Sequence, residues 1–335
     1  MAGDPAGGDS IKLTFRLGEE SMHSAENDVL AVAYDAYGGP EVLKLRSIPA
    51  PPLAQDQVLV EVRAASMNPV DWKVRSGMLQ KFFPVAFPTI TGRDGAGEVI
   101  AAAADADASL VGKRVCFLAQ RGAGTWSQKI ALQASLAVPI PSGMSYEEAA
   151  SLPLAGISAW VGLVQTADVK PGMRVLIHAA AGGVGSMAVQ IARLRGATVI
   201  ATCSGRNVDF VRALGAQEAI PYDQTAFEER ARDIDVVFDV IGGDVHRRSY
   251  AVLKRGGIIV ALAAAPFEDE SARWGVKLAT PQVLSDPAIL AEIVELVAAG
   301  TLKPCVERVL PIADFAKAHQ MSQTGHARGK TVLIL

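Results

Sequence analysis

The residues from Gly172 to Arg193 combine a short apolar run, a glycine-rich turn and an amphipathic helix pattern. The turn has the spacing Ala179-x-x-Gly182-x-x-Gly185, a variant of the dinucleotide-binding fingerprint. Glycines let the backbone approach a phosphate, and the helix amino terminus offers free N–H groups and a positive dipole end. A tight packing turn without a ligand is the alternative. The predicted pyrophosphate contacts are Ala181, Gly182, Gly183, Val184 and Gly185.

The next strand pattern indicates which dinucleotide would bind. In a doubly wound fold, an acidic residue at the end of the second strand binds the 2′-hydroxyl of NAD, whereas a nearby cation suits the 2′-phosphate of NADP. Here that strand ends at Ser204, and Arg206 follows without an intervening Asp or Glu. Ser204 offers a hydroxyl, and Arg206 offers a guanidinium group that can bind a phosphate through two N–H groups. Tyr222, after the expected third strand, could supply a third contact. A solvated Arg206 and an edge-packed Tyr222 are the alternatives, but the pattern favours NADP.

Two further positions follow from the same sheet. Ile241 and Gly242 come directly after the expected fourth strand, at the carboxyl edge where ligands bind in open α/β sheets. We therefore expect cofactor contacts from their backbone. His178 precedes the glycine turn, and its place in the strand pattern predicts a strand residue rather than a catalytic base.

The elements that position these residues predict an α/β protein. Residues 29–154 are β-rich, with expected strands at 58–62, 97–101 and 114–118 separated by proline and glycine turns. From about residue 155, strands and helices alternate, which implies a parallel sheet with right-handed crossovers. A final strand at 330–335 is placed to return to the first part. The alternating strands are expected at 174–178, 198–202, 234–241 and 257–263, and helices at 208–214, 245–253 and 288–299.

Composition narrows the function classes. The chain has 335 residues, half of them hydrophobic, which suggests about two domains. A net charge of −3 predicts no nucleic-acid partner, and no apolar run predicts a membrane span. Three cysteines without ligand spacing argue against a disulfide framework and favour the cytoplasm. Residues 1–28 read as a disordered tail without a transit or secretion signal, with Met22 as a second potential start.

These motifs together resemble the medium-chain dehydrogenase/reductase superfamily, and within it the zinc-free quinone oxidoreductase group. The Asn-Pro-Val-Asp-x-Lys run at 68–73 resembles that of alkenal/one (enone) reductases. The resemblance implies a GroES-like catalytic domain, formed by 29–154 and 300–335, that clasps a Rossmann domain at 155–299, with the active site in the cleft. It covers the chain from about residue 29 and is carried by segments 37–43, 67–77, 152–160, 172–193 and 326–333.

The same resemblance bears on metal use. Zinc-binding members of the superfamily carry a cysteine where this chain has Asn68, and Gly-His-Glu where it has Gly92-Arg93-Asp94, and the four-cysteine lobe is missing. We therefore expect no metal. Without a Lewis acid, an alkoxide is hard to stabilise at neutral pH, so quinones or α,β-unsaturated carbonyls, which accept hydride directly, fit better.

The family pattern also implies the remaining site residues. Asn68 would donate to a substrate carbonyl or hold the nicotinamide ribose, with a loop cap as the alternative. Asp71 would orient a neighbour or relay a proton, or cap the following helix. Lys73 stands where many quinone reductases have tyrosine; it would bind ribose or stabilise an enolate, or be a solvated lysine. Ser158 would lie near the nicotinamide, or bond its own helix, and Lys330 would reach the cofactor phosphates, or face water.

We therefore predict an NADPH-dependent, metal-free reductase that transfers hydride to a small-molecule quinone or to the C=C bond of an enone. A pathway-specific enoyl reductase with a larger substrate is one alternative. A non-enzymatic NADPH-binding sensor or interaction protein is another, because Lys73 and Leu79 depart from the quinone reductase pattern and leave the proton donor unnamed. The resemblance also implies a homodimer formed through the edge of the Rossmann sheet.

Overall fold

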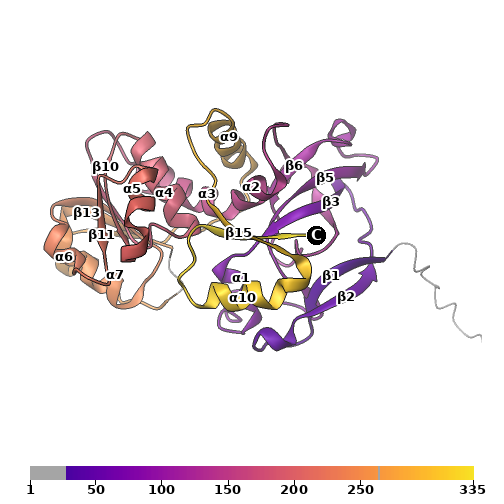
Figure 1. Ribbon diagram of the computed structural model, residues 1–335, viewed down its shortest axis with the longest axis horizontal. Helices are drawn as coiled ribbons and strands as arrows, with labels where there is room; N and C mark the ends of the chain where they lie inside the picture. The colour runs from indigo at the N-terminus through magenta and orange to yellow at the C-terminus, as the bar shows by residue number, and fades with distance from the viewer. Residues whose placement is uncertain (1–27, 263–264) are drawn as a thin grey trace, which may run out of the picture.

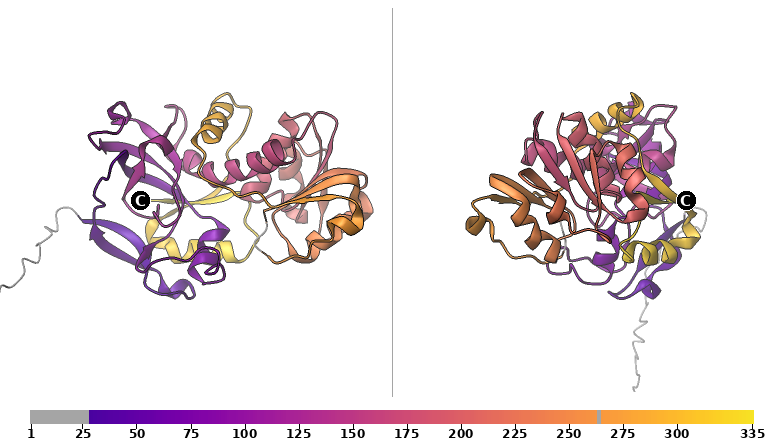
Figure 2. Two further views of the ribbon diagram at one scale, coloured as in Figure 1. Left: turned by 180° about the vertical axis from the view of Figure 1, so that it is seen from behind. Right: turned by 60° about the vertical axis from the view of Figure 1, so that its left-hand side comes forward.

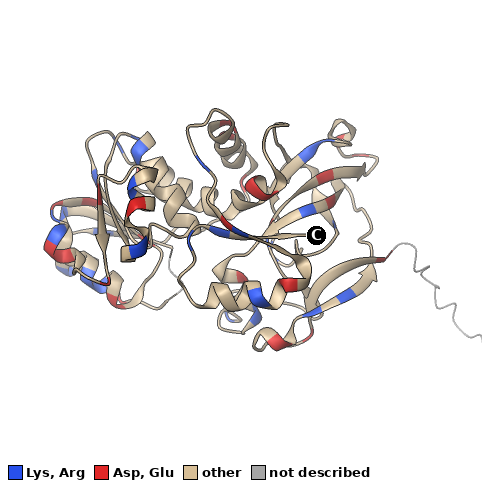
Figure 3. Cartoon of the chain, viewed as in Figure 1, with Lys and Arg blue, Asp and Glu red and all other residues tan. Residues whose placement is uncertain are grey.

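The computed structural model describes residues 28–262 and 265–335 and contains two β-sheet regions joined by helices (Figures 1 and 2). Of the expected tail, residues 1–28, all but the last residue lie outside the described residues, and Asp28 is instead the first residue of a strand. In the described part, no helix is long and apolar enough to cross a membrane. Acidic and basic residues are interspersed along both regions (Figure 3).

The first region is built from antiparallel pairs and one parallel pair. A three-stranded sheet has the order β2-β1-β4, and a larger sheet has the order β15-β16-β3-β5-β6-β8, with β7 also paired to β3. The final strand pairs antiparallel with β3, so the end of the chain returns to the first sheet as expected. The bounds are β1 Asp28–Tyr34, β2 Lys44–Pro49, β3 Gln57–Ser66, β4 Thr89–Ile90, β5 Asp94–Ala102, β6 Arg114–Leu118, β7 Lys129–Gln133, β8 Val138–Pro139, β15 Val306–Pro311 and β16 Lys330–Ile334.

The second region is a six-stranded sheet of order β11-β10-β9-β12-β13-β14 in which every pairing is parallel. Its central strands read as continuous apolar runs because helices cover both faces of a parallel sheet. The crossovers reverse direction between β9 and β12, which places the ligand crevice at the start of α4. The bounds are β9 Arg174–Ile177, β10 Thr198–Cys203, β11 Glu218–Pro221, β12 Ile234–Asp239, β13 Leu253–Ala261 and β14 Lys277–Ala279.

Helices connect and cover the two sheets. The link between them begins with a capping box, in which Ser145 and Glu148 satisfy each other's backbone N–H groups at the start of α2. Pro153 then opens α3, and α1 packs beside α10 in the first region. The bounds are α1 Pro69–Arg75, α2 Tyr146–Ser151, α3 Pro153–Trp160, α4 Gly183–Leu194, α5 Val208–Leu214, α6 Phe227–Arg230, α7 Gly243–Ser249, α8 Ser271–Trp274, α9 Pro287–Ala298 and α10 Phe315–Gln323.

Several expected boundaries need correction. β12 ends at Asp239 rather than at 241, because the Asp239 carboxylate accepts the N–H groups of Ile241 and Gly242 and turns the chain. The expected helix at 245–253 ends earlier, and Leu253 already begins β13. The segment 265–281, for which the sequence predicted no element, contains α8 and the edge strand β14.

One apolar core spans both regions. The largest buried cluster joins Ala64, Ala96 and Cys116 of the mixed sheet to residues of α2, α3 and the parallel sheet such as Val175 and Ile177. Removing such apolar surface from water stabilises the contact by roughly 25 cal/mol per Å². The two sheets therefore share a packed boundary, and polar side chains at that boundary are held in fixed positions.

Candidate active site

The glycine turn after β9 has the geometry that a phosphate cradle needs. Gly182 caps α4 without any side-chain hydrogen bond, so the N–H groups of the first turn have no protein cap. A Cβ atom on Gly185 would lie 2.2 Å from the carbonyl oxygen of Ala179, so only glycine lets the helix pack on this turn. The residues therefore fit a pyrophosphate, held by the N–H groups of Gly183, Val184 and Gly185.

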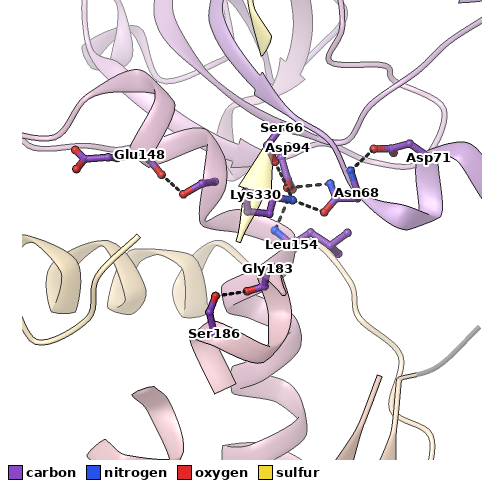
Figure 4. A network of polar contacts seen from close by, with 10 residues as sticks. Ser66, Asn68, Asp71, Asp94, Glu148, Leu154, Gly183, Ser186 and Lys330 are labelled. Carbon is purple, nitrogen blue, oxygen red and sulfur yellow. Dashed lines mark hydrogen bonds and ion pairs between the residues drawn. The ribbon is translucent and has the colours of Figure 1, made fainter. Parts of the chain in front are cut away.

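A buried polar cluster lies next to this turn (Figure 4). Its centre is Asp94, whose Oδ2 accepts bonds from Ser66 Oγ at 2.7 Å, Asn68 Nδ2 at 2.9 Å and Lys330 Nζ at 3.1 Å. The Oδ1 atom of Asp94 accepts the backbone N–H of Leu154, at 2.9 Å, where α3 begins. Lys330 also donates to Asn68 Oδ1 at 2.5 Å. The carboxylate thus joins β3, β5, β16 and α3.

The start of the final strand, β16, connects this cluster to the glycine turn. Gly329 donates its N–H to the Ala181 carbonyl at 2.7 Å and forms a bridge with Gly182. The aliphatic stem of Lys330 then passes over Gly183, where an added Cβ would lie 2.7 Å from Lys330 Cδ. Lys330 is only 6 % exposed, so the interpretation that it faces water is wrong. Its ammonium lies at the junction of the turn and the cluster.

Asp71 and Asn68 start α1 together. Asp71 Oδ2 accepts the backbone N–H of Asn68 at 2.8 Å, so Asp71 caps the start of α1. The side chain of Asn68 instead bonds to Asp94 and Lys330. Burial raises the pKa of Asp71 to about 7, against the lowering effect of that hydrogen bond. A capping role therefore coexists with a carboxyl group that exchanges a proton near neutral pH.

The remaining expected residue of α1 is Lys73. Its side chain is half-buried, and its Nζ lies 5.5 Å from the centre of the Trp72 ring. Burial lowers the pKa of Lys73. The side chain is thus neither fully solvated nor part of the Asp94 cluster, and it comes from the same helix as Asp71.

The adenosine end differs from the sequence-based expectation. Arg206 is exposed and donates to the His326 carbonyl at 2.8 Å, and Ser204 Oγ accepts Asn207 Nδ2 at 3.0 Å. Tyr222 is 49 % exposed, directly after β11. An acidic group does lie here, because Asp223 accepts the N–H of Gly205 at 2.9 Å. The sequence pattern indicated no acidic residue at the end of β10 because Asp223 follows the neighbouring strand β11. Both strands end at the same edge of the sheet.

The end of β12 is held by a buried network. The Asp239 carboxylate accepts the N–H groups of Ile241 and Gly242 through one oxygen and lies 2.8 Å from His246 Nδ1 through the other. Any backbone contact of Ile241 or Gly242 with a ligand would therefore use their carbonyl groups. The ring of His246 is 3.2 Å from the hydroxyl of Tyr250.

His178 and Ser158 are both buried near the start of the parallel-sheet region. His178 is buried and lies 3.0 Å from Thr202 Oγ1 and 2.9 Å from Ser249 Oγ. Burial lowers the pKa of His178 to about 4, so the imidazole is neutral rather than a catalytic base. His178 directly follows β9, however, and is not the strand residue that the pattern predicted. Ser158 is 6 % exposed in α3, the helix whose first turn is anchored by Asp94.

Sequence reasoning missed Asp94 and Ser66 as parts of this site. Their partners are 26 to 236 residues away in the chain, so no local spacing marks them. The signal that could have found Asp94 is an acidic residue in a run of small, apolar strand residues, since a buried charge requires a partner.

The donors around Asn68 do not fit zinc. A catalytic zinc site needs three Cys, His or carboxylate ligands, whereas this cluster contains one carboxylate, one amide and a buried ammonium. In residues 28–262 and 265–335, no group of three His, Cys, Asp or Glu side chains is arranged to hold a metal. The Lys330 ammonium already provides the positive charge that pairs with Asp94, and it would repel a divalent cation.

Comparisons with known proteins place the chain in a family. The "Alcohol dehydrogenase GroES-like domain" family matches residues 54–142, and the "Zinc-binding dehydrogenase" family matches residues 214–333. The chain is 32 % identical over 321 residues to a chloroplastic quinone-oxidoreductase homologue of Spinacia oleracea, covering 90 % of this chain and 97 % of the relative. It is 34 % identical to an NADPH-dependent alkenal/one oxidoreductase of Arabidopsis thaliana, covering 92 % and 80 %.

A solved structure supports the same family assignment. The quinone oxidoreductase of Escherichia coli, determined with NADPH, superposes with a TM-score of 0.84 at 27 % identity, covering 91 % of this chain and all of the other. The fold is that of a medium-chain dehydrogenase/reductase, a GroES-like β-rich part and a Rossmann sheet. Within that superfamily, the chain belongs to the quinone oxidoreductase group, as its motifs predict.

Proposed function

We propose that this chain is an NADPH-dependent, zinc-independent reductase of quinones or of the C=C bond of α,β-unsaturated carbonyl compounds. One observation carries the proposal: Lys330 joins the glycine turn of α4 to the Asn68–Asp94 cluster, so a dinucleotide and a polar catalytic group would share one site. The relatives named as quinone and as NADPH-dependent alkenal/one oxidoreductases support the substrate class and the cofactor.

The cofactor contacts that we propose run along the carboxyl edge of the parallel sheet. The first-turn N–H groups of α4 would hold the pyrophosphate. Ser204, Arg206 and Tyr222 would surround the adenosine ribose, and Ile241, Gly242 and Ser158 would lie towards the nicotinamide. When bound, NADPH supplies the hydride for the reduction.

Side chains of the first region would stabilise the charge that develops on the substrate oxygen. Asn68 has two N–H donors, of which Asp94 takes one, so the other is available to a carbonyl oxygen. Lys330 and Asp94 fix the amide in that orientation and act as positioning residues. Lys73 would add positive charge. Asp71, with a pKa of about 7, would hold a proton for transfer to the reduced product.

We further propose the coarse organisation implied by these contacts. Residues 29–154 and 300–335 would form the catalytic domain and residues 155–299 the NADP-binding domain, which the pairing of β16 with β3 supports. A homodimer through the edge strand β14 and a cytoplasmic location are proposals from the family pattern and from the three free cysteines. Light scattering on the purified protein tests the dimer.

The test of the proposed function is NADPH oxidation, followed by absorbance, with phenanthrenequinone, an alkyl vinyl ketone and a simple aldehyde, each with and without a chelator. We expect turnover of quinone or enone that the chelator leaves unchanged. Turnover of the aldehyde alone, lost with chelator, would overturn the proposal. NADPH binding with no turnover would favour the sensor or the pathway-specific enzyme instead.

A further inference from the structure

The chain carries a carboxylate at the place where adenine dinucleotides are distinguished. Parallel strands β10 and β11 end side by side, with Cys203 opposite Pro221. The turn after β10 lies against the turn after β11, because Tyr222 donates its N–H to the Cys203 carbonyl at 3.0 Å. Asp223 is the next residue, and its carboxylate accepts the Gly205 N–H through both oxygens, at 2.9 and 3.2 Å.

This arrangement puts opposite charges on two adjoining turns. Arg206 follows Gly205 directly, and both Arg206 and Asp223 are exposed. The carboxylate also lies close enough to Cys203 to help raise the pKa of that thiol to about 11, after burial as the main cause. In open α/β sheets, a carboxylate at the end of the second strand, here β10, accepts the 2′-hydroxyl of NAD, and a cation there holds the 2′-phosphate of NADP. Asp223 follows β11, but its bond to the Gly205 N–H brings its carboxylate to the end of β10.

We propose that Asp223 is a cofactor-specificity residue that opposes Arg206, so that this protein binds NADH as well as NADPH. The inference rests on the proposed function and adds the cofactor range of the same site. The Asp223 carboxylate repels a 2′-phosphate and occupies the Gly205 N–H that would otherwise donate to it. The same oxygens suit a 2′-hydroxyl, which is a donor. Arg206 favours the phosphate.

The test measures equilibrium binding rather than turnover. Dissociation constants of NADPH and NADH are determined by calorimetry for the wild-type protein, for Asp223→Asn and for Arg206→Gln. An asparagine keeps an oxygen for the Gly205 N–H, so the turn is retained while the charge is removed. The matched control is Glu292→Gln, an exposed residue of α9 with the same change in charge.

The wild-type constants should lie within about tenfold of each other, since one nearby carboxylate offsets one guanidinium. Asp223→Asn should tighten the binding of NADPH by about fivefold to tenfold and leave the affinity for NADH unchanged or weaker. The gain in NADPH affinity should be smaller at high salt. Arg206→Gln should weaken the binding of NADPH and leave that of NADH unchanged. The control should change neither constant.

The outcomes separate the inference from the proposed function. If the wild type binds both dinucleotides and Asp223→Asn changes both equally, or neither, Asp223 only orders the turn and the inference is wrong. A wild type that binds NADPH more than a hundredfold tighter than NADH also overturns it. If the folded wild type binds neither dinucleotide, the proposed function fails as well.

Discussion

In the parallel sheet, the groups available to a ligand are mainly backbone atoms at strand ends, whereas in the seven-stranded sheet they are side chains. The first turn of α4 presents N–H groups next to glycines, within a segment of a few residues. The Asp94 cluster instead collects Ser66, Asn68 and Lys330 from strands and a loop far apart in sequence. A local backbone motif depends on a few residues, while a side-chain cluster depends on the whole sheet.

Substitutions in the glycine turn and in the Asp94 cluster should also differ in their energetic cost. An atom added to Gly185 meets the backbone of Ala179, which cannot move aside without shifting the helix. A change in the cluster leaves a charge without its partner in a buried place, which costs more. The comparison therefore predicts large stability losses in the cluster and smaller, binding-centred losses in the turn.

The largest effect is expected from Asp94→Asn. Removing the charge leaves the Lys330 ammonium buried without a counter-charge, which should lower the free energy of unfolding by about 3–5 kcal/mol in urea titrations. The double variant with Lys330→Met should lose less than Asp94→Asn alone. The matched control is Arg247→Gln, in an exposed pair with Asp244, with an expected loss of about 0–1 kcal/mol. Equal losses in both pairs would contradict the comparison.

Gly185→Ala should have the next largest effect. The new methyl would lie 2.2 Å from the Ala179 carbonyl oxygen. We expect about 1–3 kcal/mol of destabilisation by urea titration. Weaker NADPH binding by calorimetry should accompany it, because the helix amino terminus must shift. Gly143→Ala is the control, since its methyl meets no atom within 4 Å. An unchanged NADPH affinity in Gly185→Ala would show that the turn does not hold the cofactor.

The buried histidines and the buried carboxyl group of Asp71 should give opposite pH dependences. Burial lowers the pKa of His178 to about 4 and of His319 to about 3, so the unfolded chain holds two extra protons below pH 6.5. Asp71, with its pKa raised to about 7, holds one extra proton in the folded chain. At pH 6.5 the two histidines of the unfolded chain are only about half protonated, so the difference approaches two minus one, or one proton, only towards pH 5. Stability should therefore fall more steeply as pH decreases, reaching about 1.4 kcal/mol per pH unit near pH 5.

Variants separate these contributions in urea titrations across the same pH range. Asp71→Asn removes the opposing group and should steepen the loss to about two protons. His178→Asn should flatten it to about none, since His319 and Asp71 then cancel. A slope that neither variant changes would mean that these groups have ordinary pKa values in the folded protein.

The smallest effect is expected in the linker between the sheets. Ser145 Oγ accepts the N–H of Glu148 at 3.1 Å and caps α2. Ser145→Ala should cost about 1 kcal/mol in urea titrations, and Ser145→Asp should recover most of it, because aspartate caps equally well. Both variants should keep the NADPH affinity of the wild type, since α2 lies outside the glycine turn. A loss of affinity would show that the linker also positions the site.

Sequence periodicity located most elements, since alternating and continuous apolar patterns depend on neighbours in the chain. β6 and α5 have the expected bounds, β9 and β10 differ by one residue at one end, and α9 differs by one residue at each end. The end of β12 was missed because a side chain of its last residue turns the backbone. The edge strand β14 was missed because three residues carry too little periodicity.

The sequence by itself determined the α/β alternation, the glycine turn and the family, because these depend on local spacing and on several motifs in order. Only the tertiary structure decided that Lys330 is buried, that Asp94 joins Asn68, and that Asp223 lies beside Gly205. Each of these contacts depends on which strands pair and where neighbouring strands end. A buried charge is stable only where pairing brings its partner, and partners distant in the chain leave no local pattern.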